Sequence, residues 1–232
     1  LMISCTRQEK QTVTILQTTD VHGVILPYDF IEKKDIKASL ASVSSYLKKV
    51  RDNNRSVILL DNGDNLQGQP PVYYYNFIDT ISNHLNAEVM NFLGYEAGTV
   101  GNHDIEAGHS VYDRLVKEYN FPLLAANAVN KMTGKPYFKP YTIIEKNGIR
   151  VAVFGLITPG IPDWLPPELY SGIEFRDMLE TARLYMPVIK KEKPDLVIGL
   201  FHSGWDDRGD KTLSGSHFDE NGCSSVAWNV PG

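Results

Sequence analysis

Short apolar runs that end in polar residues recur along this chain and limit what it can fold into. Runs of this kind cover 13–20, 56–64, 96–104, 122–129 and 195–204, and all but the fourth end in a polar cluster. Their apolar character is continuous rather than alternating, which is typical of strands buried on both faces. We therefore expect interior strands in a layered protein.

The segments between these runs predict helices and one hairpin. Residues 36–53 and 173–192 carry apolar side chains at a spacing of three to four, and Pro194 closes the second pattern. Residues 140–160 differ, because two strand-like runs there flank Asn147-Gly148, a hairpin signature. This order of elements predicts an α/β fold with a mainly parallel sheet and at least one antiparallel addition.

The composition fits one folded domain. The chain has 232 residues, of which 42% are hydrophobic and 22% charged, so it can bury a sizeable core. Its formal net charge of −5 implies no basic surface for long nucleic acid. No apolar run approaches the ~20 residues that span a bilayer. Without repeats or linkers in the sequence, we expect a tail over 1–12 and one domain over 13–232.

The tail has two interpretations. Cys5 follows a short apolar stretch and a small residue, and it precedes the polar stretch from Thr6 to Gln11. One interpretation is the remnant of a bacterial lipoprotein signal, with Cys5 as the lipid anchor, the polar stretch as a tether, and a periplasmic or cell-envelope location. The other is a plain disordered end without an anchor.

Four of the apolar runs end in side chains that bind metals in other proteins. Carboxyl ends of strands are where ligands bind in open α/β sheets. In an extended segment alternate residues face the same way, so Asp20 and His22 are expected to reach one ion together. The full set is Asp20 and His22 in TTDVHG, Asp64 in DNGDNLQG, Asn102 and His103 in GNHD, and His202 in FHSG.

The chemistry of this set favours divalent metal ions. Oxygen and imidazole donors without a thiolate suit manganese, zinc, iron or magnesium better than a structural zinc knot. Two carboxylates and three of the other four residues also fit a two-metal centre ~3.5–4 Å across, with one carboxylate bridging. Each motif has a plainer alternative: Asp61 and Asp64 as turn formers around Asn62-Gly63, or His202 as a core histidine. Four such coincidences at strand ends favour the metal centre.

In this order and at this spacing, TTDVHG, DNGDNLQG, GNHD and FHSG resemble the calcineurin-like metallophosphoesterase superfamily. The match is nearer to its secreted bacterial branch of 5′-nucleotidases and 2′,3′-cyclic-nucleotide 2′-phosphodiesterases, and it covers nearly everything from Val13 to Gly232. The resemblance implies a metallophosphoesterase-type αββα fold, a β-sandwich of two mixed sheets flanked by helices. It also implies hydrolysis of a nucleotide or another phosphoester by water that two metal ions activate.

The same resemblance implies a role for each metal ligand. Asp20 and His22 would bind the first metal ion, and Asp64 would bridge both ions. Asn102 and His202 would bind the second.

Further roles concern the substrate. His103 would face the phosphate beside Asn102, stabilise developing charge and protonate the leaving alkoxide. Relatives of the 5′-nucleotidase type orient this histidine with an Asp three residues later, and Glu106 stands at that position here. Asp104 is expected to fix the loop rather than to touch the substrate.

Two features of the family do not occur in the printed sequence: a Gly-His-x-His motif and a C-terminal domain whose aromatic residues clamp the base. We therefore expect a C-terminally incomplete catalytic domain, in which each metal ion lacks one imidazole. Asn62, Gln67-Gly68 and Ser203 favour the 2′,3′-cyclic-nucleotide 2′-phosphodiesterase/3′-nucleotidase branch. The alternatives are a 5′-nucleotidase and a phosphate- or nucleotide-binding protein that has lost catalysis.

Overall fold

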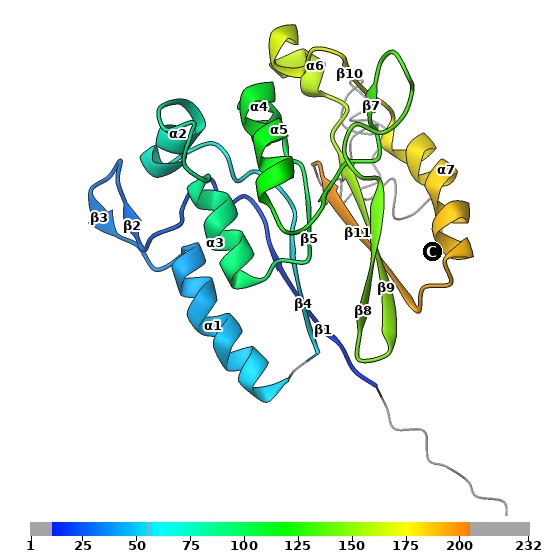
Figure 1. Cartoon of the computed structure of the whole chain (residues 1–232), viewed down its shortest axis with the longest axis horizontal. Coiled ribbons are helices and arrows are strands. Elements are labelled where there is room, and N and C mark those ends of the chain that lie inside the picture. Colours follow the sequence, from blue (N-terminus) through cyan, green and yellow to red (C-terminus); the bar gives the residue numbers. More distant parts are fainter. Residues whose placement is uncertain (1–10, 55, 205–232) are drawn as a thin grey trace, which may run out of the picture.

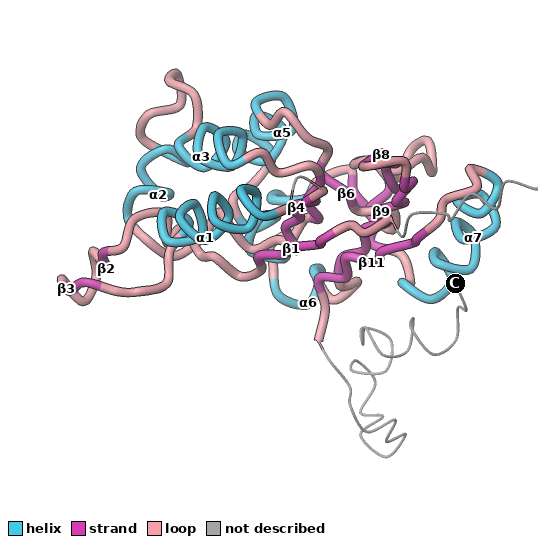
Figure 2. The backbone as a smooth tube through the Cα atoms, turned by 90° about the horizontal axis from the view of Figure 1, so that it is seen from below, coloured by secondary structure: helices cyan, strands magenta, loops and turns pink. Residues whose placement is uncertain are grey.

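The computed structural model describes residues 11–54 and 56–204. Two sheets lie face to face, and helices cover both outer faces (Figures 1 and 2). Helices α1 (Leu40–Asn53), α3 (Leu85–Leu93) and α5 (His109–Glu118) lie on one side, and α7 (Met178–Lys191) lies on the other. The predicted αββα sandwich is confirmed. Cys5 and most of the predicted tether lie outside the described residues.

The strands form two principal sheets. The first is parallel throughout its described strands and has the order β1 (Thr14–Thr18), β4 (Val57–Asp61), β5 (Ala97–Thr99), β6 (Leu123–Leu124). In the second, β9 (Ile149–Ile157) pairs in parallel with β11 (Leu196–His202) and antiparallel with β8 (Tyr141–Lys146). The predicted parallel pairing with an antiparallel addition is therefore confirmed.

Shorter elements complete the fold. Two small antiparallel pairs are β2 (Tyr28–Asp29) with β3 (Lys34–Asp35), and β7 (Ala128–Asn130) with β10 (Ile173–Phe175). The remaining helical elements are α2 (Pro70–Phe77), α4 (Asn102–Glu106), α6 (Ile161–Trp164) and the 3₁₀ turn η1 (Pro167–Tyr170).

Strand β4 shows why the apolar runs do not alternate. All five of its residues are buried. Val57 and Leu59 pack in one cluster with side chains of α1, α3 and α5, whereas Ile58 and Leu60 pack in another with side chains of the second sheet. Because each face of β4 has a covering layer, both sets of alternate side chains are apolar. The prediction of strands buried on both faces is confirmed.

The hairpin and the two helices form at the predicted places, with shorter helices. Asn147 and Gly148 both have positive φ, 52° and 75°, as a two-residue turn between β8 and β9 requires. The helix predicted over 36–53 begins at Leu40, because the Ser39 hydroxyl caps it by accepting from the backbone N–H of Ser42. The pattern over 173–192 combines strand β10 with helix α7, which begins after its cap, Asp177.

The prediction of one strand over 122–129 is wrong. The segment contains β6, which pairs with β5 in the first sheet, and the start of β7, which pairs with β10. Asn127 lies between them with a fully buried side chain. Its side-chain amide bonds both backbone groups of Ile157 and the carbonyl of Arg176. These bonds fix Asn127 in a turn, so the backbone cannot continue as one hydrogen-bonded strand from β6 to β7.

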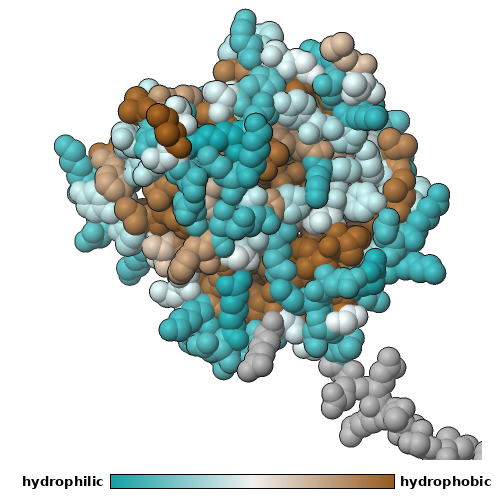
Figure 3. Space-filling model, in the orientation of Figure 1, coloured by the Kyte–Doolittle hydropathy of each residue, from teal (hydrophilic) through white to brown (hydrophobic). Residues whose placement is uncertain are grey.

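The outer surface is largely polar, as Figure 3 shows for one face. Apolar areas interrupt this face, one of them at the upper left, in the region of α2. At the end of α2 and in the segment after it, Phe77, Ile78 and Ile81 are exposed. Val72 on the same helix is fully buried, so α2 contributes to the core through one side only. Within the described ranges, none of the helices has the length and apolar character that crossing a membrane requires.

Gly155 in β9 marks a close approach of the two sheets. A Cβ atom at this position would collide with the side chain of Leu124 and lie 2.9 Å from its carbonyl oxygen. We expect Gly155→Ala to lower the free energy of unfolding by about 1–3 kcal/mol, because well-packed backbone cannot yield without displacing β6. Urea unfolding measures the change. Gly204→Ala is the control, since no atom of the described residues lies within 4 Å of a Cβ built there; equal losses in both variants would contradict the close approach.

His84 is a buried cap of helix α3. Its Nδ1 accepts from the backbone N–H of Asn86 at 3.1 Å, and its Nε2 lies 2.9 Å from the side-chain oxygen of Asn76. These partners require the neutral tautomer with the proton on Nε2. Burial, together with the positive charge of Arg114, lowers the pKa of His84 to about 4.

Stability should therefore fall in mild acid. The unfolded chain takes up this proton near pH 6.5 and the folded chain only near pH 4, so stability is complete above 6.5 and falls between these values. The loss amounts to about 3 kcal/mol. Urea unfolding from pH 7 to 4 compares the natural chain with His84→Asn, which keeps a capping side chain. An equally steep decline in the variant would assign the pH dependence to another group.

Candidate metal centre

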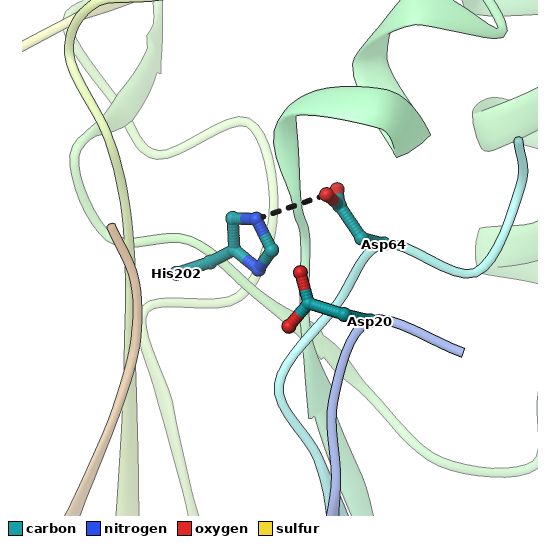
Figure 4. A group of neighbouring side chains, drawn as sticks. All are labelled: Asp20, Asp64 and His202. Carbon is teal, nitrogen blue, oxygen red and sulfur yellow. Dashed lines mark ion pairs between the residues drawn. The ribbon is translucent and has the colours of Figure 1, made fainter. Parts of the chain in front are cut away.

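Asp20, Asp64 and His202 come together from both sheets. Asp20 and Asp64 follow β1 and β4 of the first sheet, and His202 is the last residue of β11 in the second. One ligand atom from each residue lies within 4.8 Å of the other two. Figure 4 shows the two carboxylates and the imidazole directed toward a common space. Segments that are distant in the sequence thus build one cluster of metal-binding side chains.

The Nε2 atom of His202 lies between two oxygen atoms. It is 3.3 Å from Oδ2 of Asp64 and 3.1 Å from Oδ1 of Asn102. Burial lowers the pKa of His202, but the hydrogen bond and charge of Asp64 outweigh burial and raise that pKa to about 9. The proton on Nε2 of His202 therefore lies close to Oδ2 of Asp64 and Oδ1 of Asn102. Imidazole nitrogen, carboxylate oxygen and amide oxygen are all atoms that bind metal ions. A divalent cation fits in place of that proton.

The other nitrogen of His202 is fixed by the backbone. Its Nδ1 lies 2.6 Å from the carbonyl oxygen of Asn62, so Nδ1 donates a hydrogen bond and Nε2 is the atom that faces the cluster. The side chain of Asn62 also donates to the carbonyl of Phe201. From the sequence, Asn62 was expected to form a turn and to mark the cyclic-nucleotide branch, and its contact with His202 was not expected. The position of Asn62 between Asp61 and Asp64 in DNGD was the sequence feature that could have indicated a contact at this site.

The expectation of an extended Asp-x-His segment is wrong. Asp20 and His22 both have left-handed backbone, with φ of 52° and 48°. The chain turns here because the N–H of Asp20 donates to Gly63 and the N–H of His22 donates to Asp64. Even so, the two side chains stay close, with Nε2 of His22 4.0 Å from Oδ1 of Asp20. Among the residues that the structure describes, the buried Nδ1 of His22 has no hydrogen-bond partner, which fits a group that binds there.

Asn102, His103 and Asp104 form the first turn of α4 rather than a strand end. The carboxylate of Asp104 is buried and accepts backbone hydrogen bonds from Gly101 and from Asp64 and its two following residues. It therefore fixes the loop, as expected. Burial and the nearby charge of Asp64 raise the pKa of Asp104.

His103 has the predicted neighbour. Its Nδ1 lies 2.5 Å from Oε2 of Glu106, three residues along the helix. The backbone N–H of His103 donates to Oδ1 of Asp64 at 2.9 Å, and its ring meets that of His22 edge to face at 5.3 Å between centroids. The imidazole thus borders the cluster with its Nδ1 engaged, which leaves Nε2 for a further group.

Asp61 and Asp64 behave differently although both are buried. Asp61 accepts from Thr18, Gly63 and Asn65, so its predicted turn-forming role is seen, and burial raises its pKa to about 7. Burial acts in the same direction on Asp64, but the hydrogen bond and charge of His202 outweigh it and lower the pKa of Asp64. Only Asp64 of this pair belongs to the cluster of metal-binding side chains in the described chain.

Comparisons with known proteins identify a family and several relatives. A family model described as calcineurin-like phosphoesterase matches residues 13–228. The chain is 31% identical over 202 residues to the 2′,3′-cyclic-nucleotide 2′-phosphodiesterase/3′-nucleotidase of Haemophilus influenzae, covering 82% of this chain and 31% of that protein. It is 35% identical over 193 residues to the 5′-nucleotidase of Vibrio cholerae, covering 83% and 34%.

A solved structure is also similar. The calcineurin-like phosphoesterase YfkN from Bacillus subtilis has a TM-score of 0.80 at 31% identity, covering 92% of this chain and 67% of that one. The chain spans about a third of the length of the two curated relatives.

We expect Asp64→Ala to abolish the binding of at least one metal ion, because this carboxylate faces the ligand atoms of both sheets. Titration calorimetry with MnCl₂ gives the number of bound ions. Asp113→Ala is the control, since Asp113 pairs with His109 on α5 and does not belong to the cluster. Both ions at full occupancy in Asp64→Ala would contradict the bridging role.

Proposed function

The chain belongs to the calcineurin-like phosphoesterase family, and we propose that it hydrolyses phosphoester bonds of nucleotides with the help of two divalent metal ions. The observation that carries this proposal is the convergence of Asp20, Asp64 and His202 within 4.8 Å. The nucleotidases among its relatives support nucleotides as the substrate class.

We propose that the described side chains hold two ions. Asp20, His22 and Asp64 would hold one, and Asp64, Asn102 and His202 would hold the other. When bound, such ions neutralise the charge of phosphate oxygens and lower the pKa of water. The absence of thiolates from the cluster favours manganese, zinc, iron or magnesium.

His103 is the proposed catalytic residue for proton transfer. Its Nδ1 contact with Glu106 fixes the orientation of the ring. The Nε2 atom then donates its proton to the leaving alkoxide, while Asn102 and His103 contact the phosphate. Glu106 acts through His103 and does not itself touch the substrate.

Within this function we propose 2′,3′-cyclic nucleotides and 3′-nucleotides as substrates. The DNGD segment with Asn62 supports this choice, and so does the similarity to the H. influenzae protein. A second candidate is 5′-nucleotide hydrolysis, which the similarity to the V. cholerae 5′-nucleotidase supports.

Parallel assays test the proposal. Hydrolysis of 2′,3′-cyclic AMP, 3′-AMP and 5′-AMP is measured with Mn²⁺ and with a chelator, on this chain and on any longer product of its gene. Metal-dependent hydrolysis, fastest on the cyclic or 3′ substrate, is expected. A preference for 5′-AMP would make 5′-nucleotides the substrates in place of cyclic and 3′-nucleotides. No hydrolysis despite bound metal would favour a phosphate- or nucleotide-binding protein.

We expect His103→Ala to lower turnover by ~10²–10⁴-fold without loss of metal, because the imidazole transfers a proton but binds no ion. Glu106→Gln should cause a smaller loss, since the ring remains but its charged partner is removed. Steady-state kinetics and metal analysis of the same samples measure both effects. A parallel loss of metal and activity in His103→Ala would instead make His103 a ligand.

A further inference from the structure

The carboxylate of Asp104 joins two loops that carry candidate ligands. Its Oδ2 accepts from the backbone N–H groups of Gly101 and Asp64 at 2.8 and 2.9 Å. Its Oδ1 accepts from those of Asn65 and Leu66 at 2.8 and 3.1 Å. The side chain therefore uses both oxygens to connect the start of α4 with the loop after β4, and the residue is only 6% exposed.

Gly101 allows this connection because it has no side chain. A Cβ atom there would lie 2.5 Å from the backbone nitrogen of Asp64 and would collide with its carboxylate. The start of α4 is thus in direct contact with Asp64. We call Gly101 and Asp104 together the α4 clamp.

The α4 clamp contacts Asp64, whose backbone conformation is unfavourable by itself. Asp64 has φ of 61°, a left-handed conformation that is costly for a residue with a side chain. In this conformation Oδ1 of Asp64 accepts from the N–H of His103, and Oδ2 faces His202 at 3.3 Å. The direction of the Asp64 carboxylate therefore depends on the backbone that Asp104 holds.

We propose that Asp104 is a positioning residue that sets the affinity of the centre for divalent metal through Asp64. This inference rests on the proposed function, because it takes Asp64 as a metal ligand. Asp104 directs its own oxygens to four backbone N–H groups, so it acts without being a ligand itself. A merely structural role would alter stability but leave the metal affinity of the folded protein unchanged.

Asp104→Asn tests the inference with almost no change in volume. Each carboxylate oxygen of Asp104 accepts hydrogen bonds from two backbone N–H groups. In the Asn variant an NH₂ group replaces one oxygen and cannot accept from its two N–H groups, so that part of the loop loses its hydrogen bonds. We expect Mn²⁺ to bind ~10–100-fold more weakly, which is typical for loss of a residue that orients a ligand. Titration calorimetry with MnCl₂ alone measures the Kd, and thermal unfolding without metal measures stability.

Asp61→Asn is the matched control. It makes the same chemical change at another buried carboxylate near the centre, the last residue of β4, which bonds Thr18 and Asn65 and lies outside the cluster. We expect its Kd for Mn²⁺ to stay near that of the natural chain, whatever its stability. Equal weakening in both variants would overturn the inference.

Gly101→Ala provides a second route if Asp104→Asn does not fold. It leaves the Asp104 carboxylate in place but moves Asp64 through the added methyl group, so weaker Mn²⁺ binding is again expected. A folded variant of either kind with the natural Kd would overturn the inference. Because these measurements use Mn²⁺ without substrate, a natural chain that binds Mn²⁺ but hydrolyses no nucleotide would overturn the proposed function alone.

Discussion

The apolar contact between the two sheets determines where every candidate ligand lies. Ile58 and Leu60 of β4 pack with Leu200 of β11 in one buried cluster, and Gly155 lets β9 approach Leu124 closely. This packing brings the ends of β4 and β11 to one place, where Asn62 and His202, 140 residues apart, form a hydrogen bond. A shift of one sheet against the other would separate His202 from Asp64.

Once the sheets are packed, polar interactions fix the backbone conformations of the candidate ligands. Three residues of the centre, Asp20, His22 and Asp64, have left-handed backbone, which Asp and His tolerate better than most side chains. Hydrogen bonds between loops maintain these conformations. The buried negative charge of Asp64 is balanced by the proton on His202, so the same atoms that attract the proton can receive a cation.

The functional assignment combines local chemistry with membership of a family. The cluster offers oxygen and imidazole donors that could hold a metal ion, and beside it Nδ1 of His103 contacts Glu106. The relatives connect this chemistry to phosphoesters. They are about three times as long as this chain.

The sequence by itself determined the layered α/β class, the hairpin at Asn147-Gly148, the cores of helices α1 and α7, and the residue types of the centre. These features depend on local periodicity, on turn chemistry and on short motifs. Only the tertiary structure decided the turn of Asp20 and His22, the division of 122–129 at Asn127, and the three bonds that Asp104 accepts from the backbone after β4. Each of these depends on hydrogen bonds between segments distant in sequence, which no local pattern of residues encodes.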